Sequence, residues 1–449
     1  MTTISTIRVL EAAQHPPAGH RSNSHSLSEY MDPRGRQFRN DDRDTMRSET
    51  SRFAAGAFAL MACCAPVVGL AQATTVPTRS IGKVDVEYPE PFTTVTSVRE
   101  LRDGRVIVAD RREKTLQLID LARGSAVPIG RSGAGPAEWG NPGVLFAMPG
   151  DTTMMPDFGN DRFFFINPDG KPGTTLRLGE NNPLQSGDLI GLDGADRALV
   201  VSEQRATNPR EGTSGIAHVV RVNRRTGRSD TVGTLAKPKG EIGVASMLGG
   251  GMMKVSTNLP LAAQDLAAIA PDGRIVIVRA EPYRVEFFAL DGKHTTGPVA
   301  TSSGIRINDA EKEAFTRSQI RPGAILTRGP AGTAPPPTGG GGVRGASRTP
   351  QLSSAEVKAM MNPDMTWPAV KPPFLAGAVQ VDRTGRVWVL RTRAWNDSIP
   401  TFDVFDTSGR VVERVTLPRL TRLVGFGNGV VYLARTDDDD LIWLQRVRR

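Results

Sequence analysis

Apolar runs alternate with tight polar turns along this chain, and the pattern returns six times. Each repeat has a glycine turn followed by a strand-like apolar stretch, as in residues 105–109 and 386–390. The turns lie at Asp103-Gly104, Pro149-Gly150, Asp193-Gly194, Asp272-Gly273, Arg383-Thr384-Gly385 and Asn428-Gly429. A short unit repeated along a whole chain predicts a circular array of small β-sheets, a β-propeller.

A second set of turns divides each repeat again. These are Asx/Gly turns, in which Asp or Asn bonds to nearby backbone and Gly adopts a positive φ. They lie at residues 120–124, 167–170, 223–227, 291–292 and 406–409. Each repeat therefore contains four short strands, A to D in chain order, which predicts four-stranded antiparallel blades.

The spacing of the glycine turns predicts the number of blades. Gly104, Gly150 and Gly194 are 46 and 44 residues apart, and Gly385 and Gly429 are 44 apart. The other two intervals, of 79 and 112 residues, are long enough to carry insertions. Six repeats follow. A seventh blade would have to lie within residues 300–375, where no alternating strand pattern occurs.

The last repeat lacks its fourth strand. It ends with the third, near residues 441–447, while residues 81–88 form an unassigned strand-like stretch. A strand from the N-terminal side would close the ring and remove its open edge. We therefore predict an all-β, six-bladed propeller over residues 80–449, closed by an N-terminal strand.

The longest insertion, about residues 300–376, lies between blades 4 and 5. A helix is expected after Asn308 or Asp309, and another from Ser353-Ser354, because these residues can cap helices. Between them, residues 330–350 are rich in Pro and Gly, as in a flexible linker. We predict a helical flap over the central channel; the alternative is a disordered surface insertion.

Residues before 74 follow a different pattern. Residues 1–45 are polar and aperiodic, so we expect them to be disordered or an incorrectly assigned start. Residues 46–73 contain a basic segment, the apolar run 53–62 and an Ala-Gln-Ala end, which indicate a secretory signal peptide cleaved near Ala73. The alternative is a cytoplasmic tail before a membrane anchor, but the apolar run is short for a span. We expect a secreted or periplasmic protein whose mature chain has no transmembrane span.

Composition narrows the possible chemistry. Both cysteines, Cys63 and Cys64, lie in the predicted signal peptide, so the mature chain would have neither disulfides nor thiolate sites. Only His218 and His294 would remain of the 5 histidines. The formal net charge of +9 forms no basic stripe interleaved with aromatic residues, which disfavours nucleic-acid binding. We expect a monomer.

Two features resemble a known group of proteins. They are the Asp-Gly-Arg strand openings and the segment 130–139, which contains Gly-Pro-Ala-Glu-Trp. Over roughly residues 80–449 the chain resembles six-bladed propellers of the NHL/TolB-like kind, particularly secreted bacterial members. Because the activities of this group are diverse, the resemblance implies a fold rather than a function.

The strand order predicts two different faces. The A–B and C–D turns on one face are tight. The B–C and D–A connections lie on the other face, which we term the loop face, and every long or unusual segment is among them. Long loops on a rigid scaffold usually carry binding. The candidate ligand-binding residues on the loop face are Asp110, Arg111, Arg131, Glu138, Trp139, Asp157, Asn160, Arg391, Arg393 and Trp395.

These candidates allow more than one chemistry. Glu138, Asp157 and Asn160 offer oxygen ligands suited to Ca²⁺, although such residues at strand ends often bind turn backbone instead. The arginines favour an anionic ligand such as a carboxylate, uronate or phosphate, or are simply solvated. Trp395 could stack on a sugar or peptide, or pack between blades. The loop 130–139 could form an anion-binding nest, or serve only as a crossing between blades.

The sequence favours binding over catalysis. No phosphate-binding loop is present, and two histidines do not complete a serine-hydrolase triad. We therefore assign no catalytic residue and no cofactor, and expect an extracytoplasmic propeller that recognises a peptide, glycan or protein. The alternative is a Ca²⁺-dependent enzyme of the lactonase or lyase type, with its site in the central channel.

Overall fold

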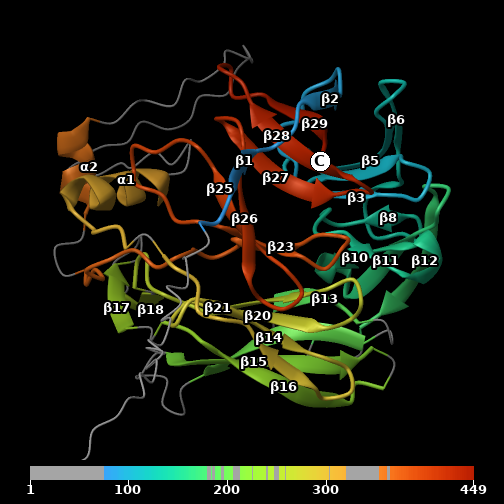
Figure 1. Cartoon of the computed structure of the whole chain (residues 1–449). Helices are drawn as coiled ribbons and strands as arrows, with labels where there is room; N and C mark the ends of the chain where they lie inside the picture. Colours follow the sequence, from blue (N-terminus) through green and yellow to red (C-terminus); the bar gives the residue numbers. More distant parts are fainter. Residues whose placement is uncertain are drawn as a thin grey trace, which may run out of the picture. The chain divides into compact units, whose positions relative to one another are not determined.

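The computed structural model describes residues 75–178, 184, 188–193, 197–205, 213–224, 226–238, 241–246, 252–257, 259–302, 304–319, 353–361 and 365–449. The expected disordered segment 1–45, the expected signal peptide 46–73 and the Pro/Gly-rich stretch 330–350 lie outside these residues. The described chain forms six four-stranded antiparallel sheets, so the predicted six-bladed propeller is confirmed (Figure 1).

The first three blades follow one another in the chain. Blade 1 contains β3 (Ser97–Glu100), β4 (Val106–Asp110), β5 (Thr115–Asp120) and β6 (Ser125–Pro128). Blade 2 contains β9 (Phe146–Ala147), β10 (Thr153–Asp157), β11 (Arg162–Ile166) and β12 (Pro172–Arg177). Blade 3 contains β13 (Asp188–Leu192), β14 (Arg197–Arg205), β15 (Thr213–Asn223) and β16 (Ser229–Ala236).

The other three blades complete the ring. Blade 4 contains β19 (Leu266–Ile269), β20 (Ile275–Arg279), β21 (Arg284–Phe288) and β22 (His294–Thr296). Blade 5 contains β23 (Val379–Val381), β24 (Val387–Leu390), β25 (Thr401–Phe405) and β26 (Val411–Thr416). Blade 6 contains β27 (Thr421–Phe426), β28 (Val430–Thr436), β29 (Ile442–Arg448) and β2 (Val84–Glu87).

The hydrophobic core lies between neighbouring blades. The second strand of a blade is covered on both faces, so it reads as a continuous apolar run, as in β4 and β20. Between blades 4 and 5, for example, Val276 and Phe287 pack in one cluster with Val387 and Phe405. Burial of such side chains contributes about 1.5–3 kcal/mol each, which makes these interfaces the main source of stability.

The N-terminal strand closes the ring, as predicted. β2 pairs antiparallel with β29, with Val84 opposite Val447 and Glu87 opposite Gln445. A further strand, β1 (Thr78–Ser80), pairs parallel with β26 and extends blade 5 to five strands. The sequence did not predict β1, because its three polar, exposed residues show no alternation.

The Asp-Gly-Arg turns have a common construction. Asp103 accepts the backbone N–H of Arg105 at 3.0 Å and its Nε at 2.7 Å, while Gly104 has a φ of 87°. Asp272 holds Arg274 in the same way, with an Nε–oxygen distance of 2.7 Å. The motif therefore stabilises the turn locally and is not part of a binding site.

The insertion contains the two predicted helices, α1 (Asp309–Gln319) and α2 (Ser354–Met360). Asn308 caps α1 by accepting the backbone N–H of Glu311, and Ser353 forms a capping box at the start of α2. No helix in the described residues is long and apolar enough to cross a membrane. Cover of the central channel by this insertion stays a prediction.

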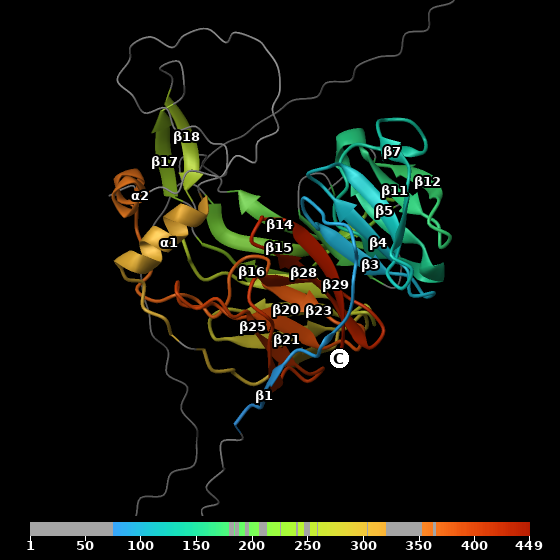
Figure 2. The ribbon, with the colours of Figure 1, turned by 90° about the horizontal axis from the view of Figure 1, so that it is seen from above.

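Smaller elements lie in the connections. A hairpin of β17 (Glu241–Ser246) and β18 (Met252–Thr257) lies between blades 3 and 4, and Figure 2 shows it on the same side of the ring as α1 and α2. The Gly-rich loop contains the short parallel pair β7 (Arg131–Ser132) and β8 (Glu138–Trp139). Two 3-10 turns, η1 (Pro149–Asp151) and η2 (Phe158–Asn160), flank β10.

Candidate functional site

The residue that ends the second strand of each blade occupies an equivalent point on the loop face. Asp110, Asp157 and Arg279 each close a hairpin, opposite the first residue of the next strand. In blade 5, Arg391 follows the last residue of β24 and lies opposite Thr401, and in blade 6 Thr436 ends β28 opposite Ile442. The predicted residues Asp110, Asp157 and Arg391 thus occupy the same repeat position in three different blades.

Asp110 holds the backbone of its own blade together. Its carboxylate is buried, with 1% of the residue exposed, and accepts the N–H of Thr94 at 2.8 Å. It also accepts the N–H groups of Arg112 and Glu113, at 2.9 and 3.0 Å. Arg111, which follows Asp110 in the chain, is exposed on the β4–β5 connection. Asp110 therefore joins the connection before β3 to the end of β4.

Asp157 has an equivalent role in blade 2 and also binds Asn160. One carboxylate oxygen accepts the N–H of Gly140 at 2.9 Å, and the other accepts Asn160 Nδ2 at 2.8 Å. Arg162 Nε donates to the second oxygen at 3.0 Å. The same guanidinium donates to the carbonyl oxygens of Ala134, Gly135 and Glu138.

Arg162 is therefore the residue that holds the Gly-rich loop, and the sequence reading missed it. The sequence does contain a hint of this role, because Arg162 is a basic residue at the start of the strand that follows the acidic Asp157. The ion pair between Arg162 and Asp157 is buried, with side chains 9% and 0% exposed respectively. We therefore assign it a structural role.

The remaining candidates of the Gly-rich loop are engaged within the loop. Glu138 accepts the N–H of Gly135 and Nε of Arg131, and both contacts hold the pKa of its carboxyl below the usual value. Trp139 is buried and donates from Nε1 to the carbonyl of Ile129 at 3.0 Å. Among the described residues, no three His, Cys, Asp or Glu side chains are placed to hold a metal ion.

The first prediction concerns Asp110. Replacing it with alanine should lower the free energy of unfolding by about 1–3 kcal/mol, because three backbone N–H groups lose their acceptor. Chemical denaturation measures this, with Glu113→Ala, an exposed carboxylate on the same connection, as the control. Equal stability of the two variants would contradict the structural role.

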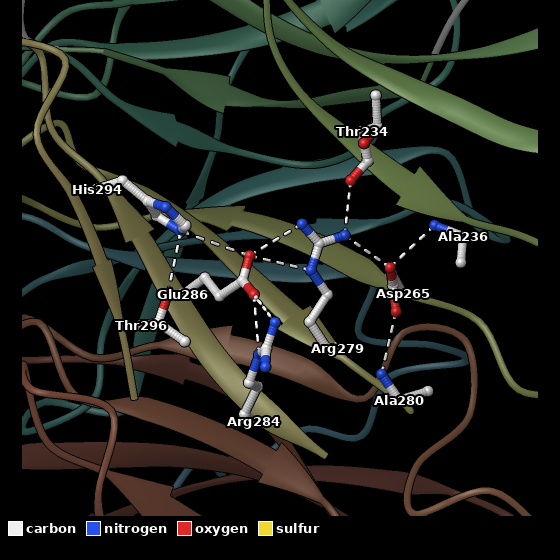
Figure 3. Close-up of polar contacts among 9 residues, drawn as sticks. All are labelled: Thr234, Ala236, Asp265, Arg279, Ala280, Arg284, Glu286, His294 and Thr296. Atoms are coloured by element: carbon white, nitrogen blue, oxygen red, sulfur yellow. Dashed lines mark hydrogen bonds and ion pairs between the residues drawn. The ribbon is translucent and has the colours of Figure 1, made fainter. Parts of the chain in front are cut away.

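Blades 3 and 4 are joined by a further polar network, drawn in Figure 3. Asp265 accepts the N–H groups of Ala236 and Ala280, as Asp110 does in blade 1. Arg279 donates to Asp265 at 2.8 Å and to Glu286 at 2.9 and 3.0 Å.

The carboxylate of Glu286 is held ionised in this network. Burial opposes ionisation, but hydrogen bonds from Arg279 and Arg284 outweigh it and hold the pKa of Glu286 below its usual value. His294 Nε2 lies 3.6 Å from the same carboxylate. The charged groups of the network are therefore paired with one another, and the network stabilises the contact between blades 3 and 4.

Three other predicted residues, Arg391, Arg393 and Trp395, come together around one cavity of the loop face. The cavity has a volume of about 310 Å³. Residues 375–378 and 390–395 form its walls, with Lys371 and Asp397 at the ends. It lies between the connection that enters β23 and the β24–β25 connection. We call it the blade 5 cavity.

The blade 5 cavity contains hydrogen-bond donors without acceptors. Arg391 is bound to Asp403 at 2.7 and 2.9 Å, but the Arg393 guanidinium has no ion pair with any described residue. The Thr392 hydroxyl is buried and lacks a partner within the described part of the chain. Trp395 is 58% exposed, and its indole N–H has no acceptor there either. The Thr392 hydroxyl is buried out of a ligand's reach, whereas the half-buried Arg393 guanidinium and the exposed Trp395 indole are open to the cavity side and can donate to a ligand that accepts hydrogen bonds.

A buried ion pair positions these residues. Glu311 in α1 and Lys371 in the returning chain form a close pair, with side chains 3% and 9% exposed. Glu311 accepts the backbone N–H of Trp395 at 3.0 Å, and Lys371 Nζ donates to the carbonyl of Arg393 at 2.8 Å. The sequence reading missed this pair, because its members are 60 residues apart and neither lies in a motif.

Comparison with known proteins does not assign this chain to a family. No protein-family model matches the chain, and no curated protein matches it in sequence. Among solved structures, it is similar to a Bacteroides fragilis protein provisionally described as exported (12% identity, covering 82% of this chain and 94% of that one, TM-score 0.42).

Two further propellers are similar at the same level. One is virginiamycin B lyase from Staphylococcus aureus (9% identity, covering 82% of this chain and 99% of that one, TM-score 0.37). The other is the calcium-binding protein regucalcin from Agrobacterium tumefaciens (12% identity, 83% and 97%, TM-score 0.34). At these identities and TM-scores the likenesses carry no functional argument, and the strand topology itself establishes the fold.

Proposed function

We propose that this protein is an extracytoplasmic recognition propeller that binds an anionic group of its ligand in the blade 5 cavity. The observation that carries the proposal is the Arg393 guanidinium, which forms no ion pair with the part of the chain that the structure describes, in the same cavity lining as the exposed Trp395. A guanidinium binds a carboxylate through two parallel hydrogen bonds, and an indole offers an apolar face with a polar edge. The extracytoplasmic location rests on the signal peptide that the sequence predicts.

The charges around the cavity support an anion. Of the three cations that line it, Lys371 is paired with Glu311 and Arg391 with Asp403. Arg393 is therefore the lining cation that is left, among the described residues, to bind an anion. Asp397 Oδ1 accepts the N–H of Ile399 at 2.9 Å, so this carboxylate stabilises its own loop. The volume lies at the lower end of the range for small-ligand sites, which suits one small group or one end of a larger ligand.

Binding rather than catalysis is favoured by the same lining. General acid–base catalysis needs groups placed to donate and accept protons across a ligand. Among the described residues, Asp397 is the only carboxylate that lines the blade 5 cavity, and no histidine lines it. We infer a binding site that needs no cofactor, whereas the calcium-dependent alternative would require Asp157 and Asn160 to give up the contacts they make with each other.

The test is the substitution Arg393→Gln, which keeps a polar side chain but removes the charge. Binding of glucuronic acid, measured by calorimetry and tryptophan fluorescence, should weaken about 10- to 100-fold, because a charge-assisted pair is lost. Arg111→Gln, on the same face in blade 1, is the matched control and should leave the affinity unchanged.

Two results would overturn the proposal. One is equal binding of glucuronic acid and its methyl ester, which lacks the charge. The other is an equal effect of Arg111→Gln and Arg393→Gln, which would indicate only a general attraction to a basic surface.

A further inference from the structure

A second cavity lies on the other side of Trp395. It has a volume of about 570 Å³ and is lined by Ala310, Ala314, Glu313 and Arg317 of α1, together with Ser354 of α2. Trp395 lines this cavity and the blade 5 cavity alike. We call it the helix cavity. A ligand that lies across Trp395 would occupy both.

We infer that the ligand is an acidic oligosaccharide, with the carboxylate of one sugar in the blade 5 cavity and a neutral sugar in the helix cavity. This inference rests on the proposed function and specifies its ligand class. The exposed indole of Trp395 would support the apolar face of a sugar ring between the two positions.

The lining of the helix cavity favours a neutral, hydroxyl-rich group. Glu313 accepts Nη2 of Arg317 at 3.0 Å, and hydrogen bonds from Ser354 and Arg317 lower the pKa of Glu313, so its carboxyl stays ionised. Because Arg317 is paired with Glu313, the described lining of the helix cavity offers no unpaired cation to bind a second carboxylate. Sugar hydroxyls both donate and accept hydrogen bonds, so they match a lining that contains a carboxylate, a guanidinium and hydroxyls.

A peptide fits the same surface less well. Extended peptides usually bind by pairing their main chain with a free strand edge. Along the β24–β25 connection, the N–H groups of Thr392, Trp395 and Asp397 already donate within the protein. The carbonyl of Arg393 is likewise occupied by Lys371. These contacts occupy main-chain groups that an extended peptide would use for pairing.

The experiment compares glucuronic acid with a disaccharide of glucuronic acid and N-acetylglucosamine. The disaccharide should bind the wild-type chain about tenfold more tightly, because it gains the contacts of the helix cavity. Ala314→Leu should fill the helix cavity and remove this gain while leaving glucuronic acid binding unchanged. Gln319→Leu, an exposed position of α1 outside the cavity, is the matched control. Ala310→Leu is the second variant if Ala314→Leu fails to fold.

The outcomes separate the inference from the proposed function. If glucuronic acid does not bind, the proposed function itself fails. If it binds but the disaccharide binds no more tightly, or if Ala314→Leu weakens both equally, the inference is overturned and the anion site remains. If trialanine, through its free carboxylate, matches the disaccharide and loses affinity in Ala314→Leu, the ligand is a peptide and the inference is again overturned.

Discussion

Lys371→Met is expected to lower the free energy of unfolding by about 3–5 kcal/mol, because it leaves the buried carboxylate of Glu311 without its counter-charge. The side chain of Glu311 is 3% exposed, so water cannot replace the lost partner. The variant also removes the hydrogen bond to the carbonyl of Arg393, so glucuronic acid binding should weaken as well. Chemical denaturation and calorimetry measure the two effects.

A double variant distinguishes stability from positioning. Glu311→Leu combined with Lys371→Met replaces the ion pair with apolar side chains, which often restores stability. Binding should stay weak, because the N–H of Trp395 no longer has its acceptor. Lys312→Met, in the same helix but paired only with the exposed Asp309, is the control and should change stability by less than about 0.5 kcal/mol. Recovery of binding in the double variant would contradict a positioning role for the pair.

The second large effect is expected at Gly82, where the N-terminal segment crosses the last strand of the ring. A Cβ at this position would lie 2.1 Å from the backbone oxygen of Arg448, and backbone cannot move aside as a side chain can. Gly82→Ala should therefore displace β2 from β29 and destabilise the protein by about 1–3 kcal/mol or more. Chemical denaturation measures the loss.

Gly143→Ala is the matched control for this prediction. Nothing lies within 4 Å of a Cβ at Gly143, and its φ is outside the left-handed region. The free energy of unfolding should change little, or rise slightly as the unfolded chain loses freedom. Equal stability of the two variants would contradict this prediction, and would mean that closure by the N-terminal strand contributes little to the stability of the propeller.

The sequence predicted the parts of the fold that depend on local chemistry. Glycine turns and apolar runs predicted the six blades, and Asn308 and Ser353 predicted the starts of α1 and α2. Each of these depends on residues close together in the chain. β1 was missed because its three polar residues show no alternation. The β17–β18 hairpin was missed because its two short runs flank a Gly-rich stretch that was interpreted as part of a long connection.

The candidate site was only partly predictable. Arg391, Arg393 and Trp395 were named from the sequence, since they lie in one connection of the loop face. Asp110 and Asp157 were also named because they lie on the loop face. They belong to blades 1 and 2, and the structure shows that their carboxylates bind backbone N–H groups. Aligning the six repeats would have shown that Asp110, Asp157 and Arg391 occupy equivalent positions rather than one site.

The sequence by itself determined the number of blades, their closure by an N-terminal strand and the face that carries the long connections. Turn chemistry and hydrophobic periodicity are properties of short segments, which a single sequence displays directly. Only the tertiary structure decided which side chains on that face are already satisfied. Glu311 and Lys371 meet across 60 residues of chain, and together they bind the backbone of Arg393 and Trp395, the two residues whose side chains are left open to a ligand.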